Sequence, residues 1–288
     1  MDFIPITGKE HFEDMRNNSI SNFSRANAAR RYAEMVLSEF IAKDLRGEIG
    51  EKKYNKLKYS EVLSKIRGAI TPELKSALEK IKVIGDKGSH YSRHEKPTKR
   101  EVDSAIKIAS EDLIPLTLHN YFSKNGFFSI EYGPKIFSTL PPSIRESVLR
   151  RLIDFRSKKL IAESNLDKNL LHRYVMACHK SGNREKIRRR LRELKSKSRI
   201  DGDMYRALER TISNFDENSH KLPIPKTMED SNRNFNAVLS SLDYYHLKNN
   251  NELISIIKTF LHGYSASEMG NLQENVLLYN EYIEFEKI

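Results

Sequence analysis

The stretch "SRANAARRYAEMVLSEFIAKD", Ser24 to Asp44, carries apolar residues at steps of three and four. The apolar stripe consists of Ala29, Tyr32, Ala33, Val36, Leu37, Phe40 and Ile41. Residues with this spacing lie on one face of an α-helix, because the helix makes one turn every 3.6 residues. The stretch therefore predicts a long amphipathic helix that buries this face against other helices.

Three more helices are expected in the first part of the chain. One lies near Lys58 to Ile70, and the next begins at Thr71-Pro72, where threonine caps the helix and proline takes its first position. We expect this helix to end around Gly85. The last begins at Thr98, which forms a capping-box pattern with Glu101. Strand signals are weak, so the sequence predicts an all-α protein in which these four helices form an antiparallel bundle.

The segment "NGFFSIEYGPKIFSTLPP", residues 125–142, has no sustained helical period and is rich in glycine, proline and aromatic residues. It is therefore expected to be a connector. Helical patterns resume at Ser143 to Ala162, Asp167 to Lys180, Arg184 to Arg199, Gly202 to Asn214 and Thr227 to Tyr245, with two more around Gly263. The sequence thus predicts a helical domain at residues 1–124, a connector at 125–142 and a second helical domain at 143–288.

Two stretches 130 residues apart resemble each other. "ALEKIKVIGDKGSH", Ala77 to His90, and "ALERTISNFDENSH", Ala207 to His220, share Ala-Leu-Glu, an aspartate and a final Ser-His. Each is followed by a proline-containing loop and a threonine-capped helix. This agreement favours a tandem duplication. Chance likeness between helical segments rich in lysine and glutamate is the alternative.

Composition narrows the class of protein. The chain has 288 residues, of which 38% are hydrophobic and 31% charged, enough apolar material for a sizeable core. Its one cysteine, Cys178, excludes an internal disulfide framework and a cysteine-built zinc site, and no histidine spacing suggests a metal site. We expect no metal and no cofactor. No signal peptide and no run of roughly 18 apolar residues is present, so we expect a cytoplasmic protein with no membrane partner.

Positive charge is concentrated in one predicted helix. The net charge of the chain is +11, and Arg184 to Arg199 holds nine basic and two acidic residues, a surplus of 9 − 2 = +7. Such a balance favours an anionic partner. Ile187, Leu191 and Leu194 form a narrow apolar stripe, and the cations on the neighbouring face are Arg184, Arg188, Arg192, Lys195 and Arg199. This row could follow a phosphate backbone, and a solvated helix face is the alternative.

The stretches "AARRYAEMVLSEFIAKD" and "ELKSALEKIKVIGDKGSH" resemble the HEPN superfamily. The likeness covers about Ser24 to Asn120 and is closest to uncharacterised HEPN-like domains found beside restriction and other defence genes. In that branch a helix ends with an arginine, Gly-Asn, two small residues and a histidine. The corresponding residues here are Lys82, Gly85, Asp86, Gly88-Ser89 and His90. The resemblance implies two tandem HEPN-like antiparallel bundles, the second strongly diverged.

Active HEPN ribonucleases use an Arg-x4-6-His motif without a metal, and two such histidines meet across a dimer. The resemblance therefore implies His90 as a catalytic candidate with Lys82 as a nearby cation, and the duplication would bring His220 to the same groove as its partner. A structural role, in which each histidine bonds a nearby carbonyl, is the alternative. A histidine can take a proton from a ribose hydroxyl and return one to the leaving oxygen. Neither copy has an arginine in the motif window, and lysine lacks the guanidinium fork. The sequence thus supports two alternatives: a metal-independent endoribonuclease and a protein without enzymatic activity.

Two functions remain. The first is a HEPN-like nucleic-acid-binding protein of a host-defence, toxin or mobile-element system, with RNA as the favoured ligand and degenerate or weak ribonuclease potential. The second is a non-enzymatic helical module that binds a protein partner or a second copy of itself. The missing arginine favours binding over cleavage. The basic helix favours nucleic acid over a neutral partner.

Overall fold

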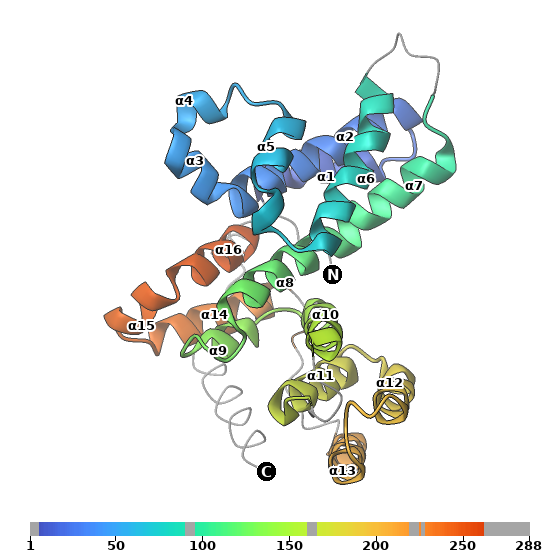
Figure 1. Cartoon of the computed structure of the whole chain (residues 1–288), viewed down its shortest axis with the longest axis vertical. Coiled ribbons are helices and arrows are strands. Elements are labelled where there is room, and N and C mark those ends of the chain that lie inside the picture. Colours follow the sequence, from blue (N-terminus) through green and yellow to red (C-terminus); the bar gives the residue numbers. More distant parts are fainter. Residues whose placement is uncertain (1–5, 90–95, 160–165, 219–224, 226–227, 262–288) are drawn as a thin grey trace. The chain divides into compact units, whose positions relative to one another are not determined.

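The computed structural model describes residues 6–89, 96–159, 166–218, 225 and 228–261. In this part of the chain every regular element is a helix, which confirms the predicted all-α class (Figure 1). The helices are α1 (Lys9–Arg16), α2 (Asn22–Val36), α3 (Lys43–Ile49), α4 (Glu51–Tyr54), α5 (Tyr59–Lys65), α6 (Pro72–Ser89), α7 (Lys99–Lys107), α8 (Leu113–Asn125), α9 (Gly133–Phe137), α10 (Pro142–Lys159), α11 (Lys168–Lys180), α12 (Arg184–Ser196), α13 (Gly202–Asn218), α14 (Met228–Ser240), α15 (Tyr244–Asn249) and α16 (Asn251–Leu261). None of these described helices is both long enough and apolar enough to cross a membrane.

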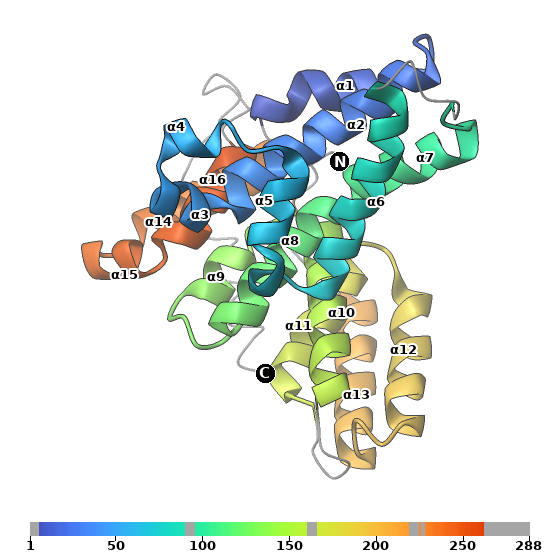
Figure 2. The ribbon, with the colours of Figure 1, turned by 45° about the horizontal axis from the view of Figure 1, so that its top comes forward.

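The chain forms two compact units. The first contains the described residues up to Lys124 together with those from Ser255 onward, and the second contains Asn125–Ile254. In the first unit, α2 packs against α1, α6 and α7 (Figure 2). In the second unit, α11 packs against α10, α12 and α13. Each unit is thus organised around one central helix.

The helix predicted from Ser24 to Asp44 is present, but it is not continuous. Ser21 caps α2, since its Oγ accepts a hydrogen bond from the backbone N–H of Ser24 at 3.1 Å. The predicted stripe is buried, with Tyr32 1% exposed and Val36 fully covered. A π-helical turn, Leu37–Ile41, separates α2 from α3. A π-helical turn contains an extra residue, which shifts the apolar face of the segment that follows.

The prediction that the third helix ends around Gly85 is wrong, because α6 continues to Ser89. The hydroxyl of Ser89 lies 2.9 Å from the carbonyl oxygen of Gly85, one turn earlier, and this hydrogen bond fits a continuing helix. The capping box at the start of α7 is confirmed. The Thr98 hydroxyl accepts from the Glu101 N–H at 3.3 Å, and the Thr98 N–H donates to the Glu101 carboxylate at 2.8 Å.

Residues 125–142, expected to be a connector, contain the short helix α9 and contribute to the core of the second unit. The aromatic and aliphatic side chains of the segment are buried, namely Phe127, Ile136, Phe137 and Leu140. Burial of apolar area, rather than helical periodicity, therefore holds this segment in place. The last predicted helix, beyond Gly263, lies outside the described residues.

Candidate functional site

Two glycines of α6 allow α6 to lie very close to α2. A Cβ atom at Gly85 would stand 2.3 Å from the Cβ of Arg30, and one at Gly88 would stand 2.7 Å from the carbonyl oxygen of Phe23. Both distances are shorter than non-bonded atoms tolerate, so residues with side chains would push the helices apart. The close approach brings polar groups of the two helices within bonding distance.

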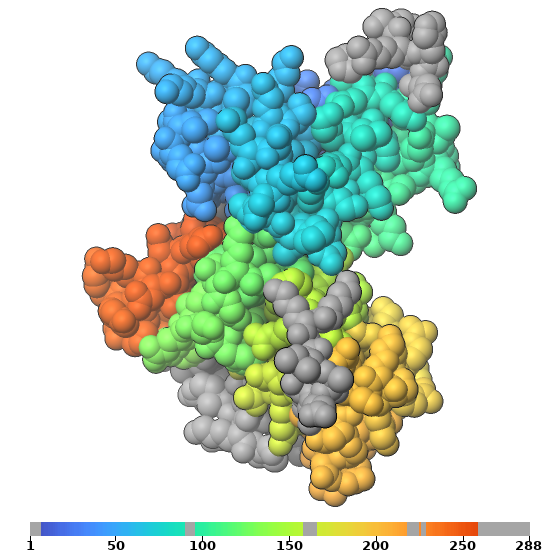
Figure 3. All heavy atoms as spheres, in the orientation of Figure 1, coloured from blue at the N-terminus to red at the C-terminus, as the bar shows by residue number. Residues whose placement is uncertain are grey.

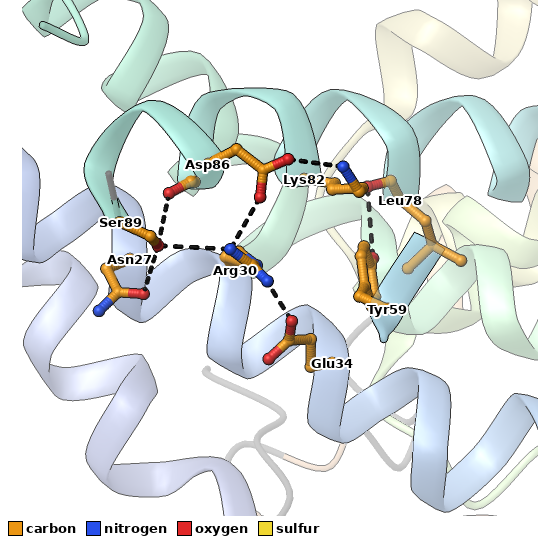
Figure 4. Close-up of polar contacts among 9 residues, drawn as sticks. Asn27, Arg30, Glu34, Tyr59, Leu78, Lys82, Asp86 and Ser89 are labelled. Atoms are coloured by element: carbon orange, nitrogen blue, oxygen red, sulfur yellow. Dashed lines mark hydrogen bonds and ion pairs between the residues drawn. The ribbon is translucent and has the colours of Figure 1, made fainter. Parts of the chain in front are cut away.

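Arg30 of α2 is the centre of these polar contacts (Figure 4). Its Nη1 atom lies 2.7 Å from Oδ1 of Asp86, and its Nε–H donates to Oε1 of Glu34 at 3.0 Å. The other carboxylate oxygen of Asp86 accepts from Lys82 Nζ at 2.5 Å. Ser89 completes the group, with its Oγ 3.4 Å from Arg30 Nη1. We call these five residues the Asp86 cluster.

The charges of the Asp86 cluster balance. Two cations, Arg30 and Lys82, face two carboxylates, Glu34 and Asp86, and the four side chains are 22% to 37% exposed. A phosphate group would have to displace Asp86 to reach either cation. The cluster therefore joins α2 to α6 and is not an open anion site.

A second cluster surrounds Asp216 of α13. Oδ1 of Asp216 lies 3.3 Å from Nη1 of Arg184, and Oδ2 accepts from Nη2 of Arg188 at 3.0 Å. Glu209, two turns earlier in α13, lies 3.8 Å from Nε of Arg188. His179 of α11 places its Nε2 3.2 Å from Oδ1 of Asp216. These residues form the Asp216 cluster.

His179 is a buried, neutral member of the Asp216 cluster. Its side chain is 1% exposed. Burial and the nearby Arg184 lower its pKa below the ordinary value of 6.5, and Asp216 only partly opposes them. The neutral imidazole thus donates its Nε2–H to Asp216. The adjacent Cys178 is fully buried, and burial raises its pKa to about 12, so it is a protonated core thiol. Among the described residues, no group of three histidine, cysteine, aspartate or glutamate side chains could hold a metal ion.

The basic helix α12 is fixed along one face and along both flanks. Ile187, Leu191 and Leu194 are buried, which confirms the predicted apolar stripe. On the flank towards α13, Lys195 lies over the ring of Tyr205, 4.6 Å from its centroid. On the opposite flank Arg190 pairs with Asp154 of α10. In Figure 3 the yellow and orange atoms of α12 and α13 form one continuous surface at the lower right.

Three further cations of α12 take no part in the ion pairs of its two flanks. Lys186, Arg189 and Arg192 are exposed, and none of them has a carboxylate partner among the described residues. The Nε–H of Arg192 donates to the carbonyl oxygen of Arg188 at 3.4 Å. Burial raises the pKa of the nearby Tyr205 phenol of α13, and the positive charge of Arg192 acts on this phenol to lower it. We call these three residues the outward cations. They are the part of the basic helix that can meet a phosphate backbone directly.

Residues 13–120 match a family model. The family is described as a domain of unknown function, DUF4145. The matched segment contains the whole Asp86 cluster and ends before α12, so the DUF4145 similarity does not reach the basic helix. The chain matches no curated protein and no solved structure.

Of the three predicted catalytic residues, the structure describes only Lys82. His90 and His220 lie outside the described residues, so their pairing stays a prediction. Lys82 lies in the Asp86 cluster, where Asp86 neutralises it.

The five predicted nucleic-acid-binding cations do not form one open row. Arg184 and Arg188 bind Asp216, and Lys195 lies over Tyr205. Arg199 follows the end of α12 and is half-buried. Of the five, only Arg192 belongs to the outward cations.

Sequence reasoning missed Arg30, Lys186 and Arg189. The HEPN motif places its arginine a few residues before the histidine, whereas Arg30 reaches Asp86 from a different helix, α2. A signal was present, because Gly85 on the buried face of α6 indicates a closely packed neighbour. Likewise, Glu209 and Asp216 lie seven residues apart, on one face of α13, and therefore mark which face of α12 is neutralised.

Proposed function

We propose that the protein binds nucleic acid, with RNA as the favoured ligand, through the outward cations of α12. The observation that carries the proposal is that some cations of this helix are paired with carboxylates while others are exposed. Arg184, Arg188 and Arg190 are held by carboxylates of neighbouring helices, while Lys186, Arg189 and Arg192 remain exposed on a helix whose position is fixed. Cations on a rigid element bind phosphates with little loss of conformational freedom.

Charge distribution supports the same surface. Residues 125–254 contain 25 basic and 16 acidic residues, a net charge of 25 − 16 = +9, whereas residues 1–124 together with 255–261 contain 24 and 18, a net charge of 24 − 18 = +6. The second unit thus attracts polyanions more strongly than the first. Contacts to phosphates carry no sequence information, so we expect binding without strong base preference.

The resemblance to HEPN ribonucleases is the reason for favouring RNA. It also motivates a cleavage test, in which His90→Ala/His220→Ala is compared with the wild-type protein on labelled single-stranded RNA. Loss of cleavage in the variant would assign the two histidines to catalysis. Binding without cleavage, unchanged in the variant, would indicate a HEPN-like protein that binds RNA but does not cleave it.

Fluorescence anisotropy with a labelled mixed-sequence RNA tests the binding site. Lys186→Gln/Arg189→Gln/Arg192→Gln should weaken binding roughly tenfold or more at low salt. The matched control is Lys52→Gln/Lys53→Gln/Lys56→Gln, which removes the same charge from exposed lysines of the first unit. The control should change affinity by less than about threefold. Equal losses in the two variants would contradict a site on α12, and a protein that retains no nucleic acid would favour the protein-interaction module.

A further inference from the structure

Two neighbouring tyrosines at the start of α15 are unusually exposed. Tyr244 is 80% exposed and Tyr245 64%, more than any other large hydrophobic side chain in the described part of the chain. An aromatic ring contributes a large apolar area, and adjacent exposed rings are typical of binding surfaces. In Figure 3 the orange segment that includes α15 lies at the left margin, open to the viewer. We call Tyr244 and Tyr245 the tyrosine pair.

The tyrosine pair stands on a well-anchored base. The ring of Tyr245 lies 5.6 Å from that of His246, and the ring of His246 lies 4.4 Å from that of Tyr132. Asn250 is fully buried, and its Nδ2 group donates to the carbonyl oxygens of Glu131 and His246 at 2.9 and 2.8 Å. These bonds fix α15 against the turn before α9. The pair is therefore presented by a rigid element.

The backbone beneath the tyrosine pair is strained. Tyr132 has a left-handed backbone conformation, with φ 64° and ψ −6°, which residues other than glycine and asparagine seldom adopt. The surrounding contacts hold this conformation and direct the Tyr132 ring towards His246. Conformations of this kind concentrate at functional sites.

The unit that carries the tyrosine pair has a net charge of +9 over residues 125–254, although the charges next to the pair are balanced. Lys135 lies over the Tyr132 ring, 5.4 Å from its centroid, and Lys248 is exposed on α15 itself. Two carboxylates also lie nearby. Asp243 and Glu131 are directed at the nitrogens of His246, at 2.7 and 3.4 Å, so they are not aimed at the tyrosine rings.

We propose that the tyrosine pair stacks on unpaired bases of a single-stranded nucleic acid, while the exposed Lys248 on the same helix contacts its phosphate backbone. This inference rests on the proposed function and specifies its ligand, since it predicts a preference for single strands over duplexes. Bases in a duplex already stack on each other, and their faces are not accessible to a tyrosine ring. Stacking on aromatic side chains tolerates any base, because every base has a flat face.

The test compares one mixed-sequence RNA as a single strand and as a duplex. Tyr244→Ala/Tyr245→Ala should weaken single-strand binding roughly tenfold or more and leave duplex binding within about twofold. Tyr244→Phe/Tyr245→Phe keeps the rings and should bind single strands like the wild type. Val83→Ala, which truncates an exposed apolar residue of the first unit, should change neither affinity.

Unchanged single-strand binding by the alanine variant, or equal losses on both ligands, would overturn the stacking proposal. The α12 variant separates this failure from failure of the proposed function. If Lys186→Gln/Arg189→Gln/Arg192→Gln still weakens binding while the tyrosine variant does not, α12 remains the site and stacking is wrong. If the α12 variant changes nothing while the tyrosine variant loses single-strand binding, the tyrosine pair stands and α12 is not the site.

Discussion

Asp86 of the first unit and Asp216 of the second occupy the same position in their helices, but they have different structural roles. Each lies 14 residues after the first residue of its helix, Pro72 in α6 and Gly202 in α13, and each binds an arginine from another helix. Asp86 closes a charge-balanced contact between two tightly packed helices. Asp216 instead anchors the surface helix α12, which keeps three further cations exposed.

The difference shows how one carboxylate can either join two core helices or fix a surface helix that keeps other cations exposed. In the Asp86 cluster one cation comes from the central helix α2 and the other from α6 itself. Both are paired with carboxylates, so the cluster has no exposed unpaired cation. In the Asp216 cluster the cations come from a helix with a large cation surplus. Whether exposed cations remain next to the aspartate therefore depends on the number of cations on the partner helix. The matching positions agree with the predicted duplication, which stays a prediction.

The largest expected effect concerns the close approach of α2 and α6. Gly85→Ala should lower the free energy of unfolding by roughly 1–3 kcal/mol, because its Cβ would overlap that of Arg30. The matched control is Gly47→Ala in α3, where a Cβ meets nothing within 4 Å. The control should stabilise the protein by about 0.5–1 kcal/mol, the usual gain of alanine over glycine in a helix.

Urea denaturation followed by circular dichroism at 222 nm measures both glycine variants. If Gly85→Ala were as stable as Gly47→Ala, the helices would not be held at the distance described, and the Asp86 cluster would lose its physical basis.

An intermediate effect separates the two aspartates. Asp86→Asn should cost about 1–2 kcal/mol, because Arg30 and Lys82 both lose a charged acceptor in a partly shielded contact. Asp216→Asn should cost less than about 1 kcal/mol, since Arg184 and Arg188 can turn to solvent. It should also raise RNA affinity a few-fold, because it removes a negative charge and releases two arginines.

Denaturation and anisotropy on the same two aspartate variants provide the readouts. A fall in RNA affinity for Asp216→Asn would show that anchoring α12 matters more than its charge.

The smallest expected effect is a pH dependence that belongs to the Asp216 cluster. The pKa of His179 is lowered in the folded protein, so the unfolded chain binds the proton first as the pH falls below about 6.5. Stability from His179 is therefore present above that pH and is lost as the pH falls towards the lower folded pKa. His172, whose pKa is also lowered by burial, adds to the loss.

Urea midpoints between pH 7.5 and 5 test this dependence. His179→Gln should reduce the slope of stability against pH by at most about 1.4 kcal/mol per pH unit, the value for one proton. An unchanged slope would show that His179 takes up its proton equally in both states.

Local patterns made much of the fold predictable. The apolar stripe of α2, the Thr98 capping box and the buried face of α12 depend only on residues within a few turns, and all three are confirmed. The predicted end of α6 around Gly85 is too early, because a glycine, an aspartate and a serine close together are typical of helix ends. The side chains of Asp86 and Ser89 are instead satisfied by Arg30 and Asn27 of α2, and this partnership depends on the tertiary structure.

The candidate site was less predictable for the same reason. The identity of the basic helix follows from its composition, but which cations stay exposed depends on where α13 presents Glu209 and Asp216. The tyrosine pair gave no sequence signal, since exposed and buried tyrosines cannot be distinguished in the short, irregular segment around Asp243.

The salt dependence of RNA binding shows whether the outward cations of α12 contact phosphates. For single strands, the logarithm of the binding constant falls with the logarithm of salt concentration with a slope of about −0.7 per phosphate contact. We expect Lys186→Gln/Arg189→Gln/Arg192→Gln to make this slope shallower by about 2 and Lys52→Gln/Lys53→Gln/Lys56→Gln to leave it unchanged. Equal slopes for the wild-type protein and the α12 variant would contradict the claim that the outward cations contact phosphates.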